Sequence, residues 1–272
     1  MRESELIELS DLNLAESHRE FARFHPDGLI HEADGLLLTR GSRDHPGLNF
    51  AMRVGKHTPA PKRLLRQAQR LFAERSRGFA IRARSHADGD LIAFLREQDR
   101  YHGGETVGMF CIGTQPELPF PKGVEVHIVD STARGRDFTD VASTAFATEG
   151  LHELVSRAAF ARPERLIAAH LRGFVGYKDG QPASVALALL CGGAAGIYWV
   201  GTAQHMRRRG LARLVLRAAH NWACDYGARA VTLQCSPKHV PLYARLGYHE
   251  LTRYPWFMVA KTVADPWPVR EA

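Results

Sequence analysis

The sequence predicts a mixed α/β fold, of the α+β type, built from two similar halves. Segments with the two-residue alternation of a strand are interleaved with segments that have the spacing of an amphipathic helix. The order of these segments in the first half is found again in the second, which indicates a degenerate internal repeat. A proline-rich stretch, residues 114–123, lies between them and is typical of a linker.

These observations predict a domain at residues 1–115, a linker at 116–123 and a second domain at 124–272. Each domain is expected to hold a mostly antiparallel mixed sheet flanked by helices. In the first half the expected order is helix, hairpin, strand, helix, strand, helix and strand, over residues 4–24, 29–41, 47–55, 60–78, 79–85, 90–100 and 107–113.

The second half is expected to begin with a strand at residues 124–130. Two helices follow, at 136–146 and 153–167, and then three antiparallel strands within 172–202. The remaining elements are a helix with a long apolar stripe, a strand, a short helix and a last strand, over residues 211–227, 229–235, 240–247 and 254–260.

Composition excludes several classes of protein. A hydrophobic fraction of 45% with 24% charged residues is typical of a globular chain with a full core. The four cysteines form no Cys-x-x-Cys pair, which argues against a zinc site and a disulfide framework. No apolar run has the length of a membrane span, and the charged N-terminus does not resemble a signal peptide. We therefore expect a cytoplasmic protein without a metal or a membrane partner.

The net charge of +7 favours anionic partners. The arginines are dispersed and are not interleaved with aromatic residues, which argues against a nucleic-acid-binding protein. One basic cluster does stand out, Arg207-Arg208-Arg209, directly before Gly210 and an apolar helical run. By itself this cluster fits a solvated helix start, a nucleic-acid contact or one wall of a phosphate site.

Three features in order resemble the GNAT superfamily of CoA-dependent N-acetyltransferases. The family's phosphate motif, Gln/Arg-x-x-Gly-x-Gly/Ala, is matched by Arg207-Arg208-Arg209-Gly210-Leu211-Ala212. A strand that ends in Val200-Gly201-Thr202 precedes it, and the segment Leu-Tyr-Ala-Arg-Leu-Gly-Tyr at 242–248 follows it. A glycine-containing loop at a helix N-terminus presents unpaired N–H groups to an anion, so the physical chemistry agrees with a pyrophosphate cradle.

The resemblance implies an acyltransferase that moves an acetyl group from the cosubstrate acetyl-CoA to a primary amine by direct attack. It assigns pantetheine contacts to Val200, Gly201 and Thr202, and the role of general acid for the leaving thiolate to Tyr243. Ser236 stands where many relatives have a cofactor-binding Asn, so that contact is expected to be weaker. The acceptor is expected to be a small molecule or a peptide, and a homodimer is left open.

The general base is the main departure from the family pattern, because the strand Gly196-Ile-Tyr-Trp-Val200 has no carboxylate. His205 is the preferred side chain by its intrinsic pKa, with Tyr177, Tyr198 and a water chain as alternatives. The missing carboxylate also keeps open a second function, that of a non-catalytic acyl-CoA sensor.

The first half resembles a GNAT domain that has lost its cofactor site, as in tandem GNAT proteins with one silent half. The turn before its long helix, Val54 to Leu65, lacks the phosphate motif. Pro59 and Pro61 in this turn carry no N–H, so they withhold backbone donors from a phosphate.

Overall fold

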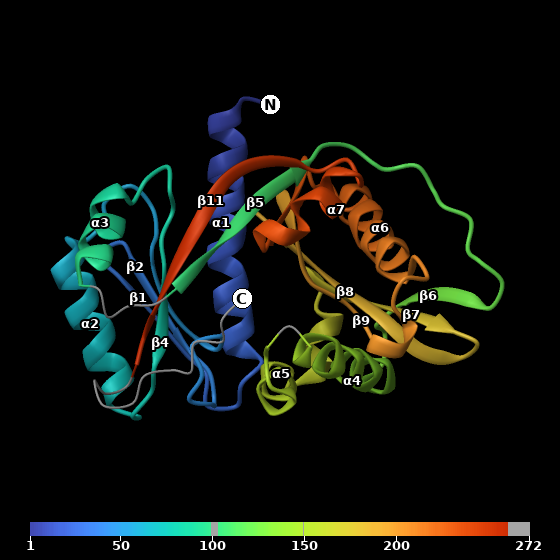
Figure 1. Cartoon of the computed structure of the whole chain (residues 1–272), viewed down its shortest axis with the longest axis horizontal. Helices are drawn as coiled ribbons and strands as arrows, with labels where there is room; N and C mark the ends of the chain where they lie inside the picture. The colour runs from blue at the N-terminus through green and yellow to red at the C-terminus, as the bar shows by residue number, and fades with distance from the viewer. Residues whose placement is uncertain (99–102, 149, 261–272) are drawn as a thin grey trace.

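The computed structural model describes residues 1–98, 103–148 and 150–260, and it shows one continuous sheet of 11 strands with helices on both faces (Figure 1). The strand order is β1-β2-β3-β4-β11-β5-β10-β9-β8-β7-β6. Two neighbouring pairs, β3 with β4 and β9 with β10, run parallel, and the other pairs are antiparallel. The predicted fold class, a mixed and mostly antiparallel sheet flanked by helices, is confirmed.

The elements of the first half occur in the predicted order. They are α1 (Glu3–Arg23), β1 (Leu29–Ala33), β2 (Leu36–Arg40), β3 (Asn49–Arg53), α2 (Pro61–Ala73), β4 (Phe79–Arg82), α3 (Gly89–Glu97) and β5 (Gly103–Cys111). The hairpin between β1 and β2 turns through Asp34 and Gly35, which both have positive φ angles, of 51° and 74°. The end of the helix predicted over 90–100 lies outside the described residues.

The second half contains β6 (Val124–Ile128), α4 (Thr132–Ala147), α5 (Glu153–Ala159), β7 (Leu171–Lys178), β8 (Gln181–Cys191), β9 (Ala194–Thr202), α6 (Leu211–Asp225), β10 (Ala230–Cys235), α7 (Val240–Ala244) and β11 (His249–Val259). Short 3₁₀ turns, η1 (Pro163–Ile167), η2 (Gln204–Met206) and η3 (Pro237–His239), connect some of them.

One predicted helix is wrong. The segment 153–167 forms α5 and then η1 instead of one helix. Pro163 explains the break, because proline lacks an N–H and disfavours helical angles in the residue before it. Arg162 accordingly has φ −120° and ψ 75°.

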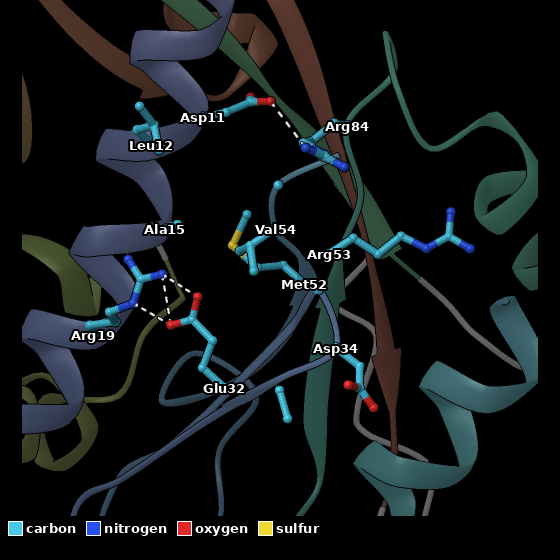
Figure 2. Close-up of a pocket in the computed structure, with 13 residues that line it drawn as sticks. Asp11, Leu12, Ala15, Arg19, Glu32, Asp34, Met52, Arg53, Val54 and Arg84 are labelled. Carbon is cyan, nitrogen blue, oxygen red and sulfur yellow. Dashed lines mark hydrogen bonds and ion pairs between the residues drawn. The ribbon is translucent and has the colours of Figure 1, made fainter. Parts of the chain in front are cut away.

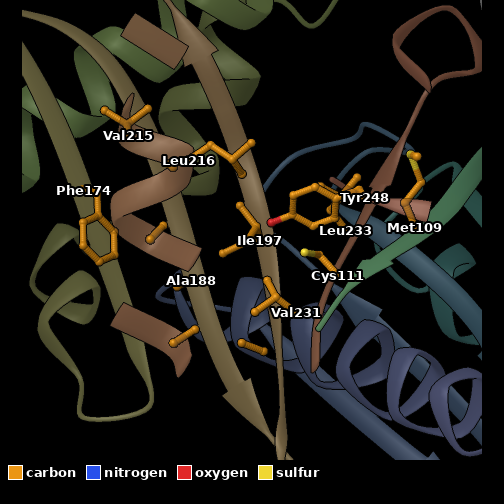
Figure 3. Packing of buried hydrophobic residues seen from close by; sticks show 14 of the residues in the cluster. Met109, Cys111, Phe174, Ala188, Ile197, Val215, Leu216, Val231, Leu233 and Tyr248 are labelled. Atoms are coloured by element: carbon orange, nitrogen blue, oxygen red, sulfur yellow. The ribbon is translucent and has the colours of Figure 1, made fainter. Parts of the chain in front are cut away.

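The two halves exchange strands at the centre of the sheet. β5, from the first half, lies between β10 and β11, and β11 pairs with β4 as well as with β5. Figure 3 shows the result: Met109 and Cys111 of β5 pack in the same core as Leu233 of β10 and Leu216 of α6. The predicted boundary at residues 116–123 coincides with the connection from β5 to β6, while a division into two domains stays a prediction.

Helix α1 crosses from one half to the other on one face of the sheet (Figure 1). Asn13 donates a hydrogen bond to the carbonyl of Leu189 in β8, at 2.9 Å. Glu20 of the same helix is buried and accepts hydrogen bonds from Arg165 and His170 of the second half, at 2.7 and 3.0 Å. The helix therefore joins both halves through buried polar contacts.

The residue directly before the predicted linker is hydrogen-bonded to α6. The backbone N–H and carbonyl of Gln115 exchange hydrogen bonds with the side chain of Asn221, both at 2.9 Å. Within the described part of the chain, no helix is both long enough and apolar enough to cross a membrane.

Candidate active site

The parallel strands β9 and β10 separate at their carboxyl ends. Their pairing runs from Ala194 and Ala230 to Ile197 and Leu233. β9 continues to Thr202 paired with β8 but not with β10, whereas the last residues of β10 pair with β5 on the other side. The sheet is therefore open between these two strand ends, where unpaired backbone groups are available to a ligand.

An irregularity in β9 shapes one side of this opening. The register between β8 and β9 shifts opposite Ala186, and Trp199 there has a positive φ of 52°. Beyond the bulge the N–H of Ala203 donates to the carbonyl of Ala183, at 2.9 Å. Antiparallel ladders alternate, so the N–H of Thr202 points away from β8, toward the opening.

Local contacts fix the end of β9. Ser184 of β8 donates its hydroxyl to the carbonyl of Gly201, at 2.8 Å, and lies 2.9 Å from the hydroxyl of Thr202. A Cβ on Gly201 would lie 2.9 Å from the Cβ of Ala145 in α4. Gly201 is therefore needed for the close approach of β9 to α4. Val200 is partly buried against the core beneath α6.

The loop before α6 is the element that the phosphate motif predicted. Gly210 caps the helix with φ 78°, in the left-handed region, and Arg208 has φ 61°. Among the described residues, the backbone N–H groups of residues 208–212 have no hydrogen-bond acceptor. These donors lie at the positive end of a helix of 15 residues. Arg208 and Arg209 are exposed beside them.

Arg207 is arranged differently from the two arginines that follow it. Its guanidinium donates to the carbonyl of Thr202, at 3.2 Å, and to the carbonyl of Ala145 at the end of α4, at 3.1 Å. It also bonds the hydroxyl of Thr148. The side chain therefore joins the loop to β9 and α4, and its guanidinium is already occupied by protein acceptors.

Ser236 and Tyr243 lie beyond the end of β10. Ser236 directly follows this strand, and its hydroxyl is 3.1 Å from Nδ1 of His239. Tyr243 lies on α7 and packs edge-on against Tyr248, at 6.1 Å between ring centroids, and against the same core as Val200. Burial raises the pKa of Tyr243 well above its ordinary value, so the phenol keeps its proton near neutral pH.

The candidates for the general base are dispersed. His205 is exposed on η2, in the loop that leads to Arg207. Tyr198 points to α1, where its hydroxyl donates to the side chain of Asn13 at 2.8 Å, and Tyr177 donates to Asp137 at 2.6 Å. Burial raises the pKa of both tyrosines. Neither phenol is therefore a ready proton acceptor at neutral pH.

An arginine follows the corresponding strand end in the first half. β3 and β4 pair in parallel as far as Met52 and Arg82, and Arg53 follows directly. The buried guanidinium of Arg53 donates to both carboxylate oxygens of Asp90, at 2.6 and 2.9 Å, and to the carbonyl of Pro59, at 2.7 Å. The guanidinium therefore joins the end of β3 to the first turn of α3 and to the segment before α2.

The sequence did not predict the roles of three residues at these strand ends, Ser184, Trp199 and Arg53. Their roles depend on contacts between distant strands, and no local motif marks them. The described residues contain no group of three or more His, Cys, Asp or Glu side chains that could hold a metal.

The comparisons with known proteins agree with this geometry. Residues 136–248, from α4 to the end of the α7 turn, match the family model of the acetyltransferase (GNAT) family. A GCN5-related N-acetyltransferase from Kribbella flavida has a similar structure, with a TM-score of 0.69 at 19% identity, over 91% of this chain and 95% of that one.

Two further solved structures are similar over nearly the whole chain. A GCN5-related N-acetyltransferase from Sphaerobacter thermophilus gives a TM-score of 0.60 at 16% identity, over 90% of this chain and 85% of that one. A tandem GNAT protein from the clavulanic acid biosynthesis pathway gives 0.61 at 14% identity, over 96% and 95%. No curated protein matches the chain significantly.

Proposed function

We propose, from the premise that residues 136–248 form a domain of the GNAT acetyltransferase family, that this protein transfers an acetyl group from acetyl-CoA to a primary amine. Acetyl transfer from an acyl-CoA is the activity of the family as a whole. Direct attack by the amine acceptor, and the residues that assist this attack, are our proposal for this chain.

The observation that carries the proposal is the run of unpaired N–H groups at residues 208–212, beside the opening between β9 and β10. Backbone donors at a helix N-terminus bind phosphate groups, and Arg208 and Arg209 add positive charge. The pyrophosphate would lie on this loop, and the pantetheine arm would follow the free edge of β9. The free N–H of Thr202 suits a hydrogen bond to that arm.

The reaction forms a C–N bond and breaks a C–S bond. The amine loses a proton, and the departing thiolate gains one. Backbone donors near Val200 at the β9 bulge would stabilise the negative charge that develops on the carbonyl oxygen, and such donors contribute about 3 kcal/mol each where measured. Tyr243 keeps its proton at neutral pH and can donate it to sulfur. The amine's proton would go to water or to His205, which is exposed on the loop.

Calorimetry with acetyl-CoA tests the cofactor site. We expect one site per chain and an affinity at least tenfold weaker, about 1.4 kcal/mol, in Gly210→Asp. The substituted side chain brings a negative charge to the phosphates and strains a backbone with φ 78°. Gly227→Asp is a matched control, because Gly227 has φ 87° at the other end of α6. Equal affinity of wild type and Gly210→Asp would contradict the proposal.

A second function is favoured by the composition of β9, which has no carboxylate. An acyl-CoA sensor would use the same loop without transferring the acetyl group. Turnover of acetyl-CoA with a panel of primary amines separates the two functions. Release of CoA that depends on the amine supports the transferase, whereas tight binding without turnover of any amine supports the sensor.

A further inference from the structure

The first half contains a cavity of about 490 Å³ between α1 and the strands β1 to β3, a volume in the range typical of small-molecule sites (Figure 2). It lies on the α1 face of the sheet, whereas the guanidinium of Arg53 extends away from it toward α2 and α3.

Apolar side chains form the floor and one wall of the cavity. Met52 and Val54 lie at its centre in Figure 2, and Leu12 and Ala15 come from α1. Leu12 is 49% exposed, whereas the other leucines of α1, Leu6, Leu9 and Leu14, are buried. An apolar ligand group would cover this side chain and remove it from water.

Charged side chains surround the apolar centre. Their guanidinium groups are less accessible to solvent than the carboxylates of Glu32 and Asp34. The side chains of Arg84 and Arg19 are 9% and 19% exposed. Arg84 is held by Asp88 and Asp11, and Arg19 by Glu32 and Glu16. Their donors therefore already have carboxylate partners.

The carboxylates of the β1–β2 hairpin are more accessible. Glu32 and Asp34 are 41% and 62% exposed, and they pair with Arg19 and Arg63 respectively. Each carboxylate offers about four acceptor positions, so one guanidinium partner leaves some of them free. Among the charged side chains that line the cavity, these two carboxylates are therefore the most exposed to a ligand, and Arg63 beside Asp34 is 52% exposed.

We propose that this cavity binds a small organic cation, an ammonium group attached to a short apolar body. The ammonium would donate to Glu32, and the apolar body would lie on Leu12, Ala15 and Met52. A small anion is disfavoured, because the exposed carboxylates repel it and the arginines are already paired. The inference does not depend on the acetyltransferase function.

Calorimetry on the full-length protein with phenethylamine tests the proposal, with 3-phenylpropionate as an anionic compound of similar shape. We expect saturable binding of the amine, weakened by added salt, and no binding of the acid. Equal binding of the two compounds, or no heat of binding with millimolar phenethylamine, would overturn the proposal.

Two variants locate the site. Leu12→Trp fills the cavity from an exposed position, so it does not threaten the fold, and it should weaken phenethylamine binding at least tenfold. Glu32→Gln should weaken it by a similar factor. The control Glu125→Gln changes an exposed carboxylate on β6, at the far edge of the sheet, and should bind like wild type. Unchanged affinity in Leu12→Trp would refute the location.

Gly210→Asp separates this inference from the proposed function. The amine should bind this variant with wild-type affinity even though acetyl-CoA binding is lost. If wild type binds acetyl-CoA but not phenethylamine, the cavity proposal fails alone. If it binds phenethylamine but not acetyl-CoA, the acetyltransferase proposal fails alone.

Discussion

Arg207, Arg208 and Arg209 are adjacent and chemically identical, but their surroundings assign them different roles. The guanidinium of Arg207 bonds carbonyls of β9 and α4, whereas Arg208 and Arg209 remain exposed beside the unpaired N–H groups of the loop. The motif in the sequence predicted where the loop lies. It could not separate the three side chains, because the acceptors at Ala145 and Thr148 come from a helix about 60 residues earlier.

This difference can be measured with two matched substitutions. Arg207→Met should lower the free energy of unfolding by about 1–2 kcal/mol, since it leaves the carbonyls of Thr202 and Ala145 without their donor. Arg208→Met should leave stability unchanged and weaken acetyl-CoA binding in a salt-dependent way. Denaturant unfolding and calorimetry of both variants give the two quantities. The opposite pattern would contradict these roles.

Tyr243 is the second residue whose role can be tested alone. Tyr243→Phe keeps the ring that packs on Tyr248 and removes only the hydroxyl, so acetyl-CoA affinity should stay nearly unchanged. General acid catalysis contributes about 10²–10⁴-fold, so kcat should fall at least tenfold where chemistry limits turnover. Ser236→Ala should instead raise KM for acetyl-CoA with little change in kcat. A wild-type kcat for the phenylalanine variant would leave Tyr243 with a packing role.

At the scale of elements, the sequence predicted the helices and strands well where periodicity is clear. The strands of the meander β7 to β9 and the apolar stripe of α6 are examples. It was wrong where proline interrupts an apparently helical pattern, at Pro163. It also gave no indication of the bulge at Trp199, because a non-glycine residue with positive φ depends on the neighbouring strand β8 for its support.

Helix α1 and the turn after it should make the protein sensitive to acid. Burial lowers the pKa of His25 to about 4, and it lowers the pKa of His18 well below the ordinary value, helped by the charges of Arg82 and Arg19. Both ring nitrogens of His18 are buried without a hydrogen-bond partner among the described residues. Protonation of either ring is therefore favoured in the unfolded chain over the folded one.

The sign of the pH dependence follows from these lowered pKa values. Stability is fully present above about pH 6.5, and it should fall by up to about 1.4 kcal/mol per histidine and pH unit as the pH drops toward 4. Denaturant unfolding at pH 7 and pH 5 measures the loss. His25→Gln, which keeps a polar group near the hydroxyl of Ser42, should lose less stability between these pH values than wild type. An equal loss in both proteins would assign the acid sensitivity to other groups.

At the scale of the whole molecule, sequence patterns could not predict the exchange of β5 and β11 between the two halves. Alternation shows that a segment is a strand, but it does not show which strand lies beside it. The repeat and the proline-rich linker suggested two separate sheets. The structure instead places β5 of the first half between β10 and β11 of the second. Met109 and Cys111 of β5 therefore belong to the same hydrophobic core as Leu233 of β10.

This topology predicts that the second half does not fold alone. A fragment of residues 124–272 retains the GNAT match but lacks β5, so β10 and β11 would lose their common neighbour and expose an apolar core (Figure 3). We expect it to be insoluble or to lack cooperative unfolding, and to bind no acetyl-CoA. The full chain with a protease site introduced between residues 116 and 123 is the control. Once cleaved, its two pieces should stay associated in size-exclusion chromatography and keep their acetyl-CoA affinity, because the exchanged strands remain in place. A soluble, cooperatively folded fragment of 124–272 that binds acetyl-CoA would show that the second half completes its sheet without β5.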